Sequence, residues 1–348
     1  MKALALVFLF LISLNLQAET IQSFQVLKEN SQMHLIAERF EVKERNKTGF
    51  LVYVLKERVA EFRKLAPQAK MLSSDINLNL KNKMALAGYH SFEQIKKMAK
   101  VLEMTYPKLA KVVPYGTSRK GLPLFAIKLS DNVEVIEDEK KVMLTSATHG
   151  DELITTEVLL ALTESLLKGY DSNQRFKKIL NNTEIYIILV VNPEGFTRRS
   201  RYSGGIDPNR QYPWPGHPNR RTPVPAIDSI MKFYKKIDFD GSIDFHASGK
   251  MVMFPWGYTR DLIQTADHQV FDRLTTDMAK ENRYKHGPIS RVIYVAKGSS
   301  ADFYYGHNSG LALGIELTTS KVPRASRIPG VVKEASEMTW KYLEHFSR

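Results

Sequence analysis

From residue 88 onward, apolar runs of strand length alternate with stretches in which apolar residues recur at helical spacing. The runs that predict strands cover residues 124–129, 141–144, 183–191, 242–245 and 311–317. The stretches that predict helices cover residues 92–109, 153–167, 227–234, 270–281 and 331–346, and Ser91 is placed to cap the first. This alternation favours an α/β fold with a mixed, mainly parallel, twisted sheet covered by helices on both faces.

A different pattern precedes this region and predicts a small α+β domain over residues 19–76. Residues 33–42 alternate in places like a strand, and residues 49–55 form a second strand candidate. Residues 57–65 have helical spacing, Pro67 closes the helix, and residues 70–76 could add a third strand. The largely polar residues 77–87 are expected to be a linker to the larger domain, residues 88–348.

Residues 1–18 have the pattern of a cleaved secretory signal. Lys2 supplies a positive start, residues 3–16 are apolar, and Ala18 offers a small residue before the cut. A membrane anchor is the alternative, but the apolar stretch is short for a span. No other run is long and apolar enough to cross a bilayer. We therefore expect an exported protein, periplasmic or extracellular, with no stable membrane insertion after cleavage.

Composition narrows the possible chemistry. The 348 residues include no cysteine, so any metal site must use nitrogen and oxygen ligands. The formal net charge is +13, but the basic residues are scattered, without a dense arm or interleaved aromatic residues. This argues against a nucleic-acid partner and fits solubility or weak attraction to an anionic cell wall. The oligomeric state is not indicated by the sequence.

Four side chains with metal or acid–base chemistry follow or end predicted strands. His149 and Glu152 come shortly after one strand, His246 ends a second, and Glu316 ends a third. In α/β sheets of this kind, sites form at the carboxyl ends of the strands, so these residues are expected to share one site. Two histidines and a glutamate, with a fourth position left for water, are the ligands of a hydrolytic zinc site. A further glutamate nearby is the usual general base.

An arginine-rich loop lies between the candidate metal ligands. Residues 192–195 (Asn-Pro-Glu-Gly) form a turn that leads to Arg198, Arg199 and Arg201, and then to residues 205–210. Arginine presents a fork of donors that matches a carboxylate, so the loop could recognise an anion. A solvated basic loop is the alternative interpretation.

Over residues 88–348, the chain resembles the zinc carboxypeptidases of the carboxypeptidase A/B type. The motifs that carry the resemblance occur in the family's order and approximate spacing. They are His149-x-x-Glu152, residues 192–195, 207–210 (Asp-Pro-Asn-Arg), 244–246 (Asp-Phe-His), 254–258 (Phe-Pro-Trp-Gly-Tyr), 293–294 (Ile-Tyr) with 298–302 (Gly-Ser-Ser-Ala-Asp), and 314–317 (Gly-Ile-Glu-Leu). The small N-terminal segment resembles an abbreviated activation segment of this family, which could be removed by cleavage or retained as an accessory domain.

The resemblance implies a metal centre and its acid–base partner. His149, Glu152 and His246 would hold one Zn²⁺ per chain. Asp207 stands where the family has an aspartate that hydrogen-bonds a ligand imidazole and fixes its tautomer. Glu316 would take a proton from zinc-bound water and return it to the leaving amine.

The resemblance also implies how substrate is bound. Asn209 and Arg210 would hold the terminal carboxylate, and Tyr294 would close over the bound residue. Arg201 would polarise the scissile carbonyl and stabilise the oxyanion. Arg198 and Arg199 are rivals for this role, because the loop length leaves the alignment open.

Three features depart from the family pattern or bear on specificity. Asp151 stands where many members carry Arg or Asn, which could alter contacts with the upstream part of the substrate. Ala301 occupies the pocket position that carries Asp in enzymes that cut basic C-termini, which argues against Lys or Arg specificity. Lys250 and Lys297 lie near the site in sequence and could favour an acidic terminal residue, or could simply point to solvent.

Three functions follow, in order of preference. The first is a secreted zinc carboxypeptidase that removes the C-terminal residue of peptides or proteins. The second is the same chemistry on cell-wall peptides, next to D-glutamate or diaminopimelate. The third is a non-catalytic peptide-binding protein. Replacement of Glu316 or Arg210 would have indicated such a protein, but both residues are present.

Overall fold

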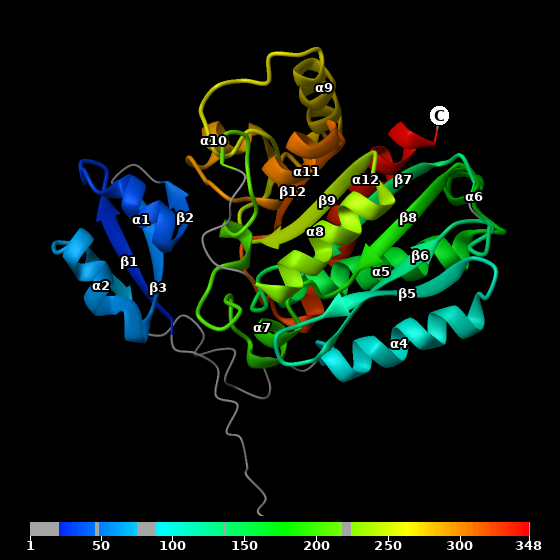
Figure 1. Cartoon of the computed structure of the whole chain (residues 1–348), viewed down its shortest axis with the longest axis horizontal. Helices are drawn as coiled ribbons and strands as arrows, with labels where there is room; N and C mark the ends of the chain where they lie inside the picture. The colour runs from blue at the N-terminus through cyan, green and yellow to red at the C-terminus, as the bar shows by residue number, and fades with distance from the viewer. Residues whose placement is uncertain (1–20, 46–48, 75–87, 136, 218–223, 348) are drawn as a thin grey trace, which may run out of the picture.

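The computed structural model describes residues 21–45, 49–74, 88–135, 137–217 and 224–347. Figure 1 shows two units, a small one at the N-terminus and a larger one that contains the rest of these residues. The expected signal peptide, residues 1–18, and the whole of the expected linker, residues 77–87, lie outside the described residues. No described helix is both long and apolar enough to cross a membrane.

The larger unit is built on an eight-stranded sheet with the order β11-β10-β12-β9-β7-β8-β6-β5. In chain order its strands are β5 (Ala110–Thr117), β6 (Pro123–Leu129), β7 (Lys140–Ser146), β8 (Thr183–Ile188), β9 (Gly241–Ala247), β10 (Met251–Phe254), β11 (Lys285–Pro288) and β12 (Leu311–Leu317). Strands β12, β9, β7 and β8 pair in parallel, and antiparallel β6 and β5 complete one edge. The predicted mixed, mainly parallel sheet is confirmed.

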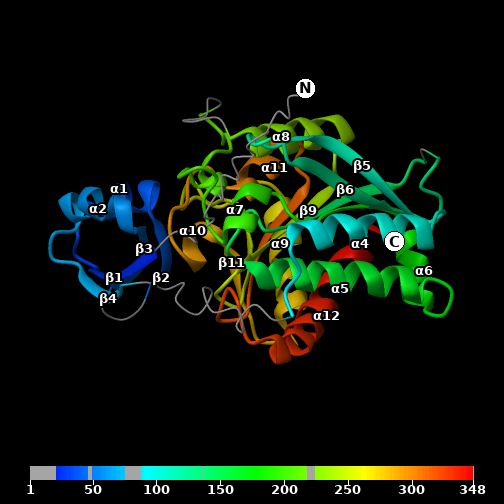
Figure 2. The ribbon, with the colours of Figure 1, turned by 90° about the horizontal axis from the view of Figure 1, so that it is seen from below.

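Helices cover both faces of this sheet. They are α4 (Phe92–Thr105), α5 (Leu153–Gly169), α6 (Gln174–Leu180), α7 (Pro193–Arg198), α8 (Pro225–Ile237), α9 (Asp267–Ala279), α10 (Ile289–Val292), α11 (Ser300–Asn308) and α12 (Ile328–Phe346). In Figure 2, α8 and α11 lie on one face, and α4, α5 and α12 lie on the other. Helix α5 is buried along most of its length, as expected for an apolar helix that packs against both the sheet and α12.

The predicted helix over residues 92–109 is shorter than expected. Ser91 caps α4 as predicted, because its hydroxyl accepts a hydrogen bond from the amide of Gln94 and the Gln94 side-chain oxygen accepts one from the amide of Ser91. The helix ends at Thr105, just before Pro107, and the chain then enters strand β5, which the sequence pattern did not predict.

The small unit has its own four-stranded antiparallel sheet, with the order β2-β3-β1-β4. Its elements are β1 (Ile21–Leu27), α1 (Met33–Arg39), β2 (Glu41–Arg45), β3 (Gly49–Leu55), the 3₁₀ turn η1 (Lys56–Arg58), α2 (Val59–Leu65) and β4 (Lys70–Ser73). Phe24, Phe40 and Phe62 pack together in a core that is separate from that of the larger unit.

One prediction for the small unit was wrong, and one strand was missed. The inner strand β1 had no counterpart in the sequence pattern. Residues 33–42, predicted as a strand, do not form one. They form helix α1 followed by the start of β2. Over residues 33–40 the buried positions are Ile36, Ala37 and Phe40, and this spacing is helical rather than alternating.

Candidate active site

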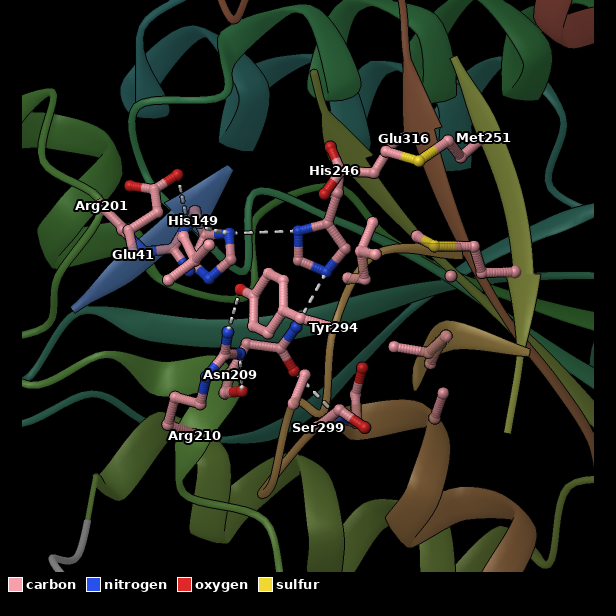
Figure 3. Close-up of a pocket in the computed structure, with 18 residues that line it drawn as sticks. Glu41, His149, Arg201, Asn209, Arg210, His246, Met251, Tyr294, Ser299 and Glu316 are labelled. Atoms are coloured by element: carbon pink, nitrogen blue, oxygen red, sulfur yellow. Dashed lines mark hydrogen bonds and ion pairs between the residues drawn. The ribbon is translucent and has the colours of Figure 1, made fainter. Parts of the chain in front are cut away.

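His149, Glu152 and His246 meet at the carboxyl ends of neighbouring parallel strands. His149 follows β7, Glu152 directly precedes α5, and His246 lies in β9. The Oε1 and Oε2 atoms of Glu152 lie 3.1 Å from His149 Nδ1 and 3.0 Å from His246 Nδ1. The two Nδ1 atoms are 3.1 Å apart (Figure 3). All three side chains are buried.

The turn that carries His149 depends on close backbone contact. A Cβ atom at Gly150 would lie 2.1 Å from backbone atoms of Gly195 and Phe196, at the start of α7. Only glycine fits there without displacing the neighbouring chain. The small residue between the two candidate ligands therefore lets this turn pack against α7 and directs both side chains to the same point.

A carboxylate holds the outer nitrogen of each imidazole. His149 Nε2 lies 3.2 Å from Asp207 Oδ1, and His246 Nε2 lies 3.0 Å from Asp244 Oδ2. A proton shared with these carboxylates leaves each Nδ1 lone pair directed toward Glu152. The role of Asp244 was not predicted, although residues two apart on a strand share a face, which brings Asp244 and His246 together.

Electrostatics keep the two outer carboxylates ionised. Burial by itself raises the pKa of Asp207, but the attraction of Arg201 and His149 outweighs it, and the pKa lies well below its usual range. Burial of Asp244 is likewise outweighed by attraction to His246 and by hydrogen bonds, so its pKa is lowered. Two carboxylates that remain anionic on the outer side of the histidines favour a cation on the inner side.

The donor set fits zinc. Two imidazole nitrogens and a carboxylate, buried and already converging, are borderline and hard donors of the kind that bind Zn²⁺ in hydrolytic sites. The outer carboxylates complete the pattern, because metal-binding histidines are usually held by such partners. His149, Glu152 and His246 would therefore hold the metal ion.

Among the three candidate arginines, only Arg201 lines the pocket around this cluster. Its side chain is 3% exposed, and its Nε and Nη2 donate to Asp207 Oδ2 at 3.0 and 2.8 Å. Its Nη1 lies 3.0 Å from His149 Nδ1. Arg198 ends helix α7, and Arg199 follows it with its guanidinium over the ring of Phe196. The geometry thus favours Arg201 as the arginine beside the reacting group.

On another wall of the pocket, Asn209 and Arg210 come from the 3₁₀ turn η2 (Pro208–Arg210). Arg210 Nη2 donates a 2.8 Å hydrogen bond to the Tyr294 hydroxyl, which Figure 3 also shows. Gly298 has a φ of +81°, and a Cβ there would lie 2.6 Å from the Arg210 carbonyl oxygen. This glycine lets the segment after Tyr294 approach η2 closely.

Two buried polar atoms that line this pocket have no hydrogen-bond partner among the described residues. One is the donor Nε of Arg210, and the other is the acceptor Oε2 of Glu316. Buried polar atoms are nearly always satisfied, so each orphan requires an explanation. A bound substrate that offers a carboxylate to Arg210 and a water molecule beside Glu316 would satisfy both atoms.

The remainder of the pocket is mostly apolar. Its apolar lining consists of Val42, Met251, Met253, Ile289, Ile293, Ala296, Ala301 and Gly314. Ala301 lies in the first turn of α11 and is 3% exposed. Neither Lys250 nor Lys297 lines the pocket: Lys250 pairs with Glu334 at 3.1 Å, and Lys297 lies 3.7 Å from Glu38. The possible role of these lysines in binding an acidic terminal residue therefore has no support.

The small unit reaches into this pocket. Glu41, at the start of β2, is 1% exposed, and its Oε1 lies 2.8 Å from Arg201 Nη1. The same oxygen lies 3.2 Å from Lys321 Nζ. Tyr294 packs against the core of the small unit. Sequence reasoning missed Glu41 and Lys321, because neither belongs to a motif and both are far in sequence from the other site residues.

Comparison with known proteins identifies the family. Residues 95–338 match the family model described as zinc carboxypeptidase. The chain is similar to carboxypeptidase SOL1 of Arabidopsis thaliana (26% identity, 69% of this chain and 52% of the relative). It is also similar to a zinc carboxypeptidase of Saccharothrix mutabilis subsp. capreolus (28% identity, 63% and 59%). The chain thus spans between half and two thirds of the length of these two relatives.

Solved structures agree on the fold. Carboxypeptidase A from Helicoverpa armigera superposes with a TM-score of 0.76 at 18% identity, over 96% of this chain and 98% of that one. Thrombin-activatable fibrinolysis inhibitor superposes with a TM-score of 0.74 at 17% identity, over 95% and 99%. With the family model matching well over half of the chain, this protein belongs to the zinc carboxypeptidase family.

Proposed function

We propose that this protein is a zinc-dependent carboxypeptidase that hydrolyses the C-terminal peptide bond of peptides or proteins. The observation that carries the proposal is the pair of buried, unpartnered atoms in one pocket, Arg210 Nε and Glu316 Oε2. In Figure 3 these two residues reach the pocket from opposite sides, with His246 between them. An anion-binding donor and a proton acceptor on either side of a metal centre suit hydrolysis next to a terminal carboxylate.

Substrate binding begins with the terminal carboxylate. Arg210, with Asn209 beside it, would hold this group, and Tyr294 would exchange its hydrogen bond to Arg210 for one to the substrate. These contacts would fix the last residue of the substrate and place the preceding carbonyl near Arg201. Such positioning can lower the barrier substantially, because it replaces a bimolecular encounter with a fixed geometry.

The chemical step needs a proton acceptor and an oxyanion partner. Bound zinc would supply Lewis acidity, which lowers the pKa of water to about 7 and polarises the carbonyl. Glu316 would take the proton from the attacking water and pass it to the nitrogen of the leaving residue as the carbon–nitrogen bond breaks. Arg201 would stabilise the negative charge on the carbonyl oxygen, a contribution on the order of 3 kcal/mol for a donor of this type.

The pocket favours an apolar terminal side chain. Met251, Met253, Ile289 and Ile293 line the pocket together with Ala301, and the aspartate that the family's enzymes for basic C-termini carry at the Ala301 position is replaced here by a methyl group. A lysine or arginine side chain there would lose its hydration without gaining a partner, which is costly. We therefore expect the enzyme to release aliphatic or aromatic C-terminal residues.

We further propose that the small unit shields this site, as an activation segment would. Glu41 occupies the Arg201 side of the pocket and excludes the scissile carbonyl from it. Glu41→Gln weakens this contact and should raise kcat/KM of the full chain about tenfold, since a hydrogen bond between charged groups contributes about 1.5–3 kcal/mol. Glu38→Gln is the matched control, because it weakens a longer pair between the two units, 3.7 Å from Glu38 to Lys297, outside the pocket. Equal activities in both variants would argue against shielding by Glu41.

The pattern of residues 1–18 supports a proposal that the protein is exported, to the periplasm or beyond. N-terminal sequencing of the protein recovered from cells and medium tests this directly. A mature chain that begins at Glu19 in an exported fraction is expected. An intracellular chain that retains Met1 would contradict it.

Binding of the terminal carboxylate gives a sharp test of the enzymatic proposal. The zinc-loaded chain should cleave a peptide that ends in phenylalanine and leave its C-terminal amide intact. Arg210→Met should reduce kcat/KM at least a hundredfold, whereas the matched variant Arg199→Met, outside the pocket, should not. Equal cleavage of acid and amide would refute carboxypeptidase activity. Isolated cell-wall peptides form a parallel arm, and their exclusive cleavage would favour the wall-remodelling alternative.

A further inference from the structure

A single carboxylate of the small unit contacts two cations of the larger unit. Oε1 of Glu41 lies 2.8 Å from Arg201 Nη1 and 3.2 Å from Lys321 Nζ, and its Oε2 lies 3.4 Å from Lys321 Nζ. Glu41 is 1% exposed and the Lys321 side chain 10% exposed. Because one oxygen reaches both nitrogens, two neighbouring oxygens of one substrate residue can also reach both.

Each of these cations also has a carboxylate partner within the larger unit. Lys321 Nζ lies 2.6 Å from Asp151 Oδ2, and Arg201 Nη2 lies 2.8 Å from Asp207 Oδ2. Asp151 is completely buried. Departure of Glu41 would therefore leave both cations held in place. A preorganised cation loses little freedom when it binds a new anion, which favours recognition at this point.

The location of Lys321 distinguishes it from the anchor for the substrate terminus. Lys321 lies 3.9 Å from Glu152 Oε1, on the side of Asp151, and does not line the pocket that contains Arg210 and Ala301. If Arg210 holds the terminal residue and Arg201 the scissile carbonyl, the next part of the substrate lies beyond Arg201. That part is the penultimate residue, which supplies the carbonyl.

We propose that Lys321 is a specificity-determining residue that binds a carboxylate on the penultimate residue of the substrate, next to the carbonyl held by Arg201. Glu41 occupies this subsite in the intact chain. The inference rests on the proposed carboxypeptidase function. Two sources share the required chemistry: the side chain of an α-linked glutamate, and the free α-carboxylate of a glutamate linked through its side chain.

The first experiment compares two peptides that differ only in a penultimate glutamate or glutamine. The small unit must leave the pocket before either peptide can bind. The fraction of open molecules is therefore the same for both peptides and cancels in the ratio of their kcat/KM values. The full, zinc-loaded chain should prefer glutamate about tenfold or more. Lys321→Met should reduce the ratio to about one, whereas Lys250→Met, a lysine outside the pocket, should preserve it. A ratio near one in the wild type, or one unaffected by Lys321→Met, overturns the inference.

A second variant distinguishes loss of the subsite from misfolding of the protein. Lys321→Met leaves the buried Asp151 without this partner, which is destabilising. The double variant Asp151→Asn/Lys321→Met removes both charges and should likewise lose the preference for glutamate. If the double variant folds and retains the preference, Lys321 is not the subsite.

Measuring peptide binding tests the Lys321 subsite independently of the proposed hydrolysis. In a Glu316→Gln background, calorimetry should show about tenfold tighter binding of the glutamate peptide, and Lys321→Met should abolish the difference. Tighter binding of the glutamate peptide without any hydrolysis by the wild type would contradict the proposed function but support the subsite. Hydrolysis without a preference for glutamate would support the function but contradict the subsite.

Two further substrates identify the source of the carboxylate. One carries glutamate linked through its α-carboxyl group, and the other carries glutamate linked through its side chain with a free α-carboxylate. A Lys321-dependent preference confined to the first assigns an acidic peptide, and one confined to the second assigns a γ-glutamyl peptide. A Lys321-independent rate for both would contradict the proposal.

Discussion

Two groups of three potential metal ligands in the described part of the chain differ in almost every physical respect. His149, Glu152 and His246 are buried, and two of them are imidazoles held by outer carboxylates. Asp131, Glu137 and Glu139 also bring their oxygens within 4.8 Å of one another, but all three are carboxylates and none is buried. Proximity of acids alone thus says little; donor type, burial and outer support separate a metal centre from a surface cluster.

The largest expected difference is in metal dependence. Dialysis of the full chain against a chelator should reduce kcat/KM at least a thousandfold, because the buried cluster then lacks the Lewis acid, and zinc should restore it. Elemental analysis of the reloaded protein should give one zinc per chain. A second equivalent of zinc that disappears in Glu137→Gln would show that the surface cluster binds metal as well.

Loss of a carboxylate that holds a histidine of the buried cluster should have the next largest effect on zinc affinity and activity. Asp244→Asn weakens the acceptor that holds His246 Nε2, and it should reduce zinc affinity or activity about 10- to 100-fold. Competition with a chromophoric chelator measures the affinity. Asp131→Asn is the matched control in the surface cluster and should change neither quantity. Comparable losses in both variants would mean that the buried cluster has no special dependence on its outer carboxylates.

The smallest predicted effect concerns stability and pH. Partial burial raises the pKa of Glu139 to about 7, and repulsion from Asp131 and Glu137 adds to the shift. A raised pKa contributes stability below the unfolded value of 4.5, and this contribution is lost as the pH rises through 7. The free energy of unfolding of Glu139→Gln, relative to wild type, should therefore increase between pH 4.5 and 8, by about 1 kcal/mol after allowance for solvent screening.

Denaturant unfolding at several pH values, with and without millimolar calcium or zinc, checks this prediction. A bound divalent cation would favour the ionised carboxylate and reverse the trend. A Glu139→Gln variant that loses stability only when metal is present would therefore show that the surface cluster binds metal after all.

The sequence pattern predicted the inner strands of the larger unit well, but it missed the strands β5, β10 and β11. It predicted the small unit poorly. The runs at residues 141–144, 242–245 and 311–317 lie within β7, β9 and β12, because buried parallel strands are nearly continuous apolar runs. In the small unit, the stretch 33–42 is too short for its apolar spacing to distinguish a helix from a strand. It contains helix α1 and the beginning of strand β2.

The site was predictable to the extent that its residues follow strands. The buried ligand cluster lies at strand ends, where such sheets place their sites. Glu41 and Lys321 lie outside every motif, and only the docking of the small unit brings them together, so no local pattern could have indicated their contact. The apolar lining from α10 and β10 likewise comes from separate segments.

The most direct test of carboxypeptidase activity is mass spectrometry of a C-terminally varied peptide mixture after incubation with the zinc-loaded chain. A zinc carboxypeptidase should remove single C-terminal residues stepwise, apolar ones fastest, and Glu316→Gln should lower the rate about 10²–10⁴-fold. Internal cleavage, or equal rates for the wild type and Glu316→Gln, would contradict this activity.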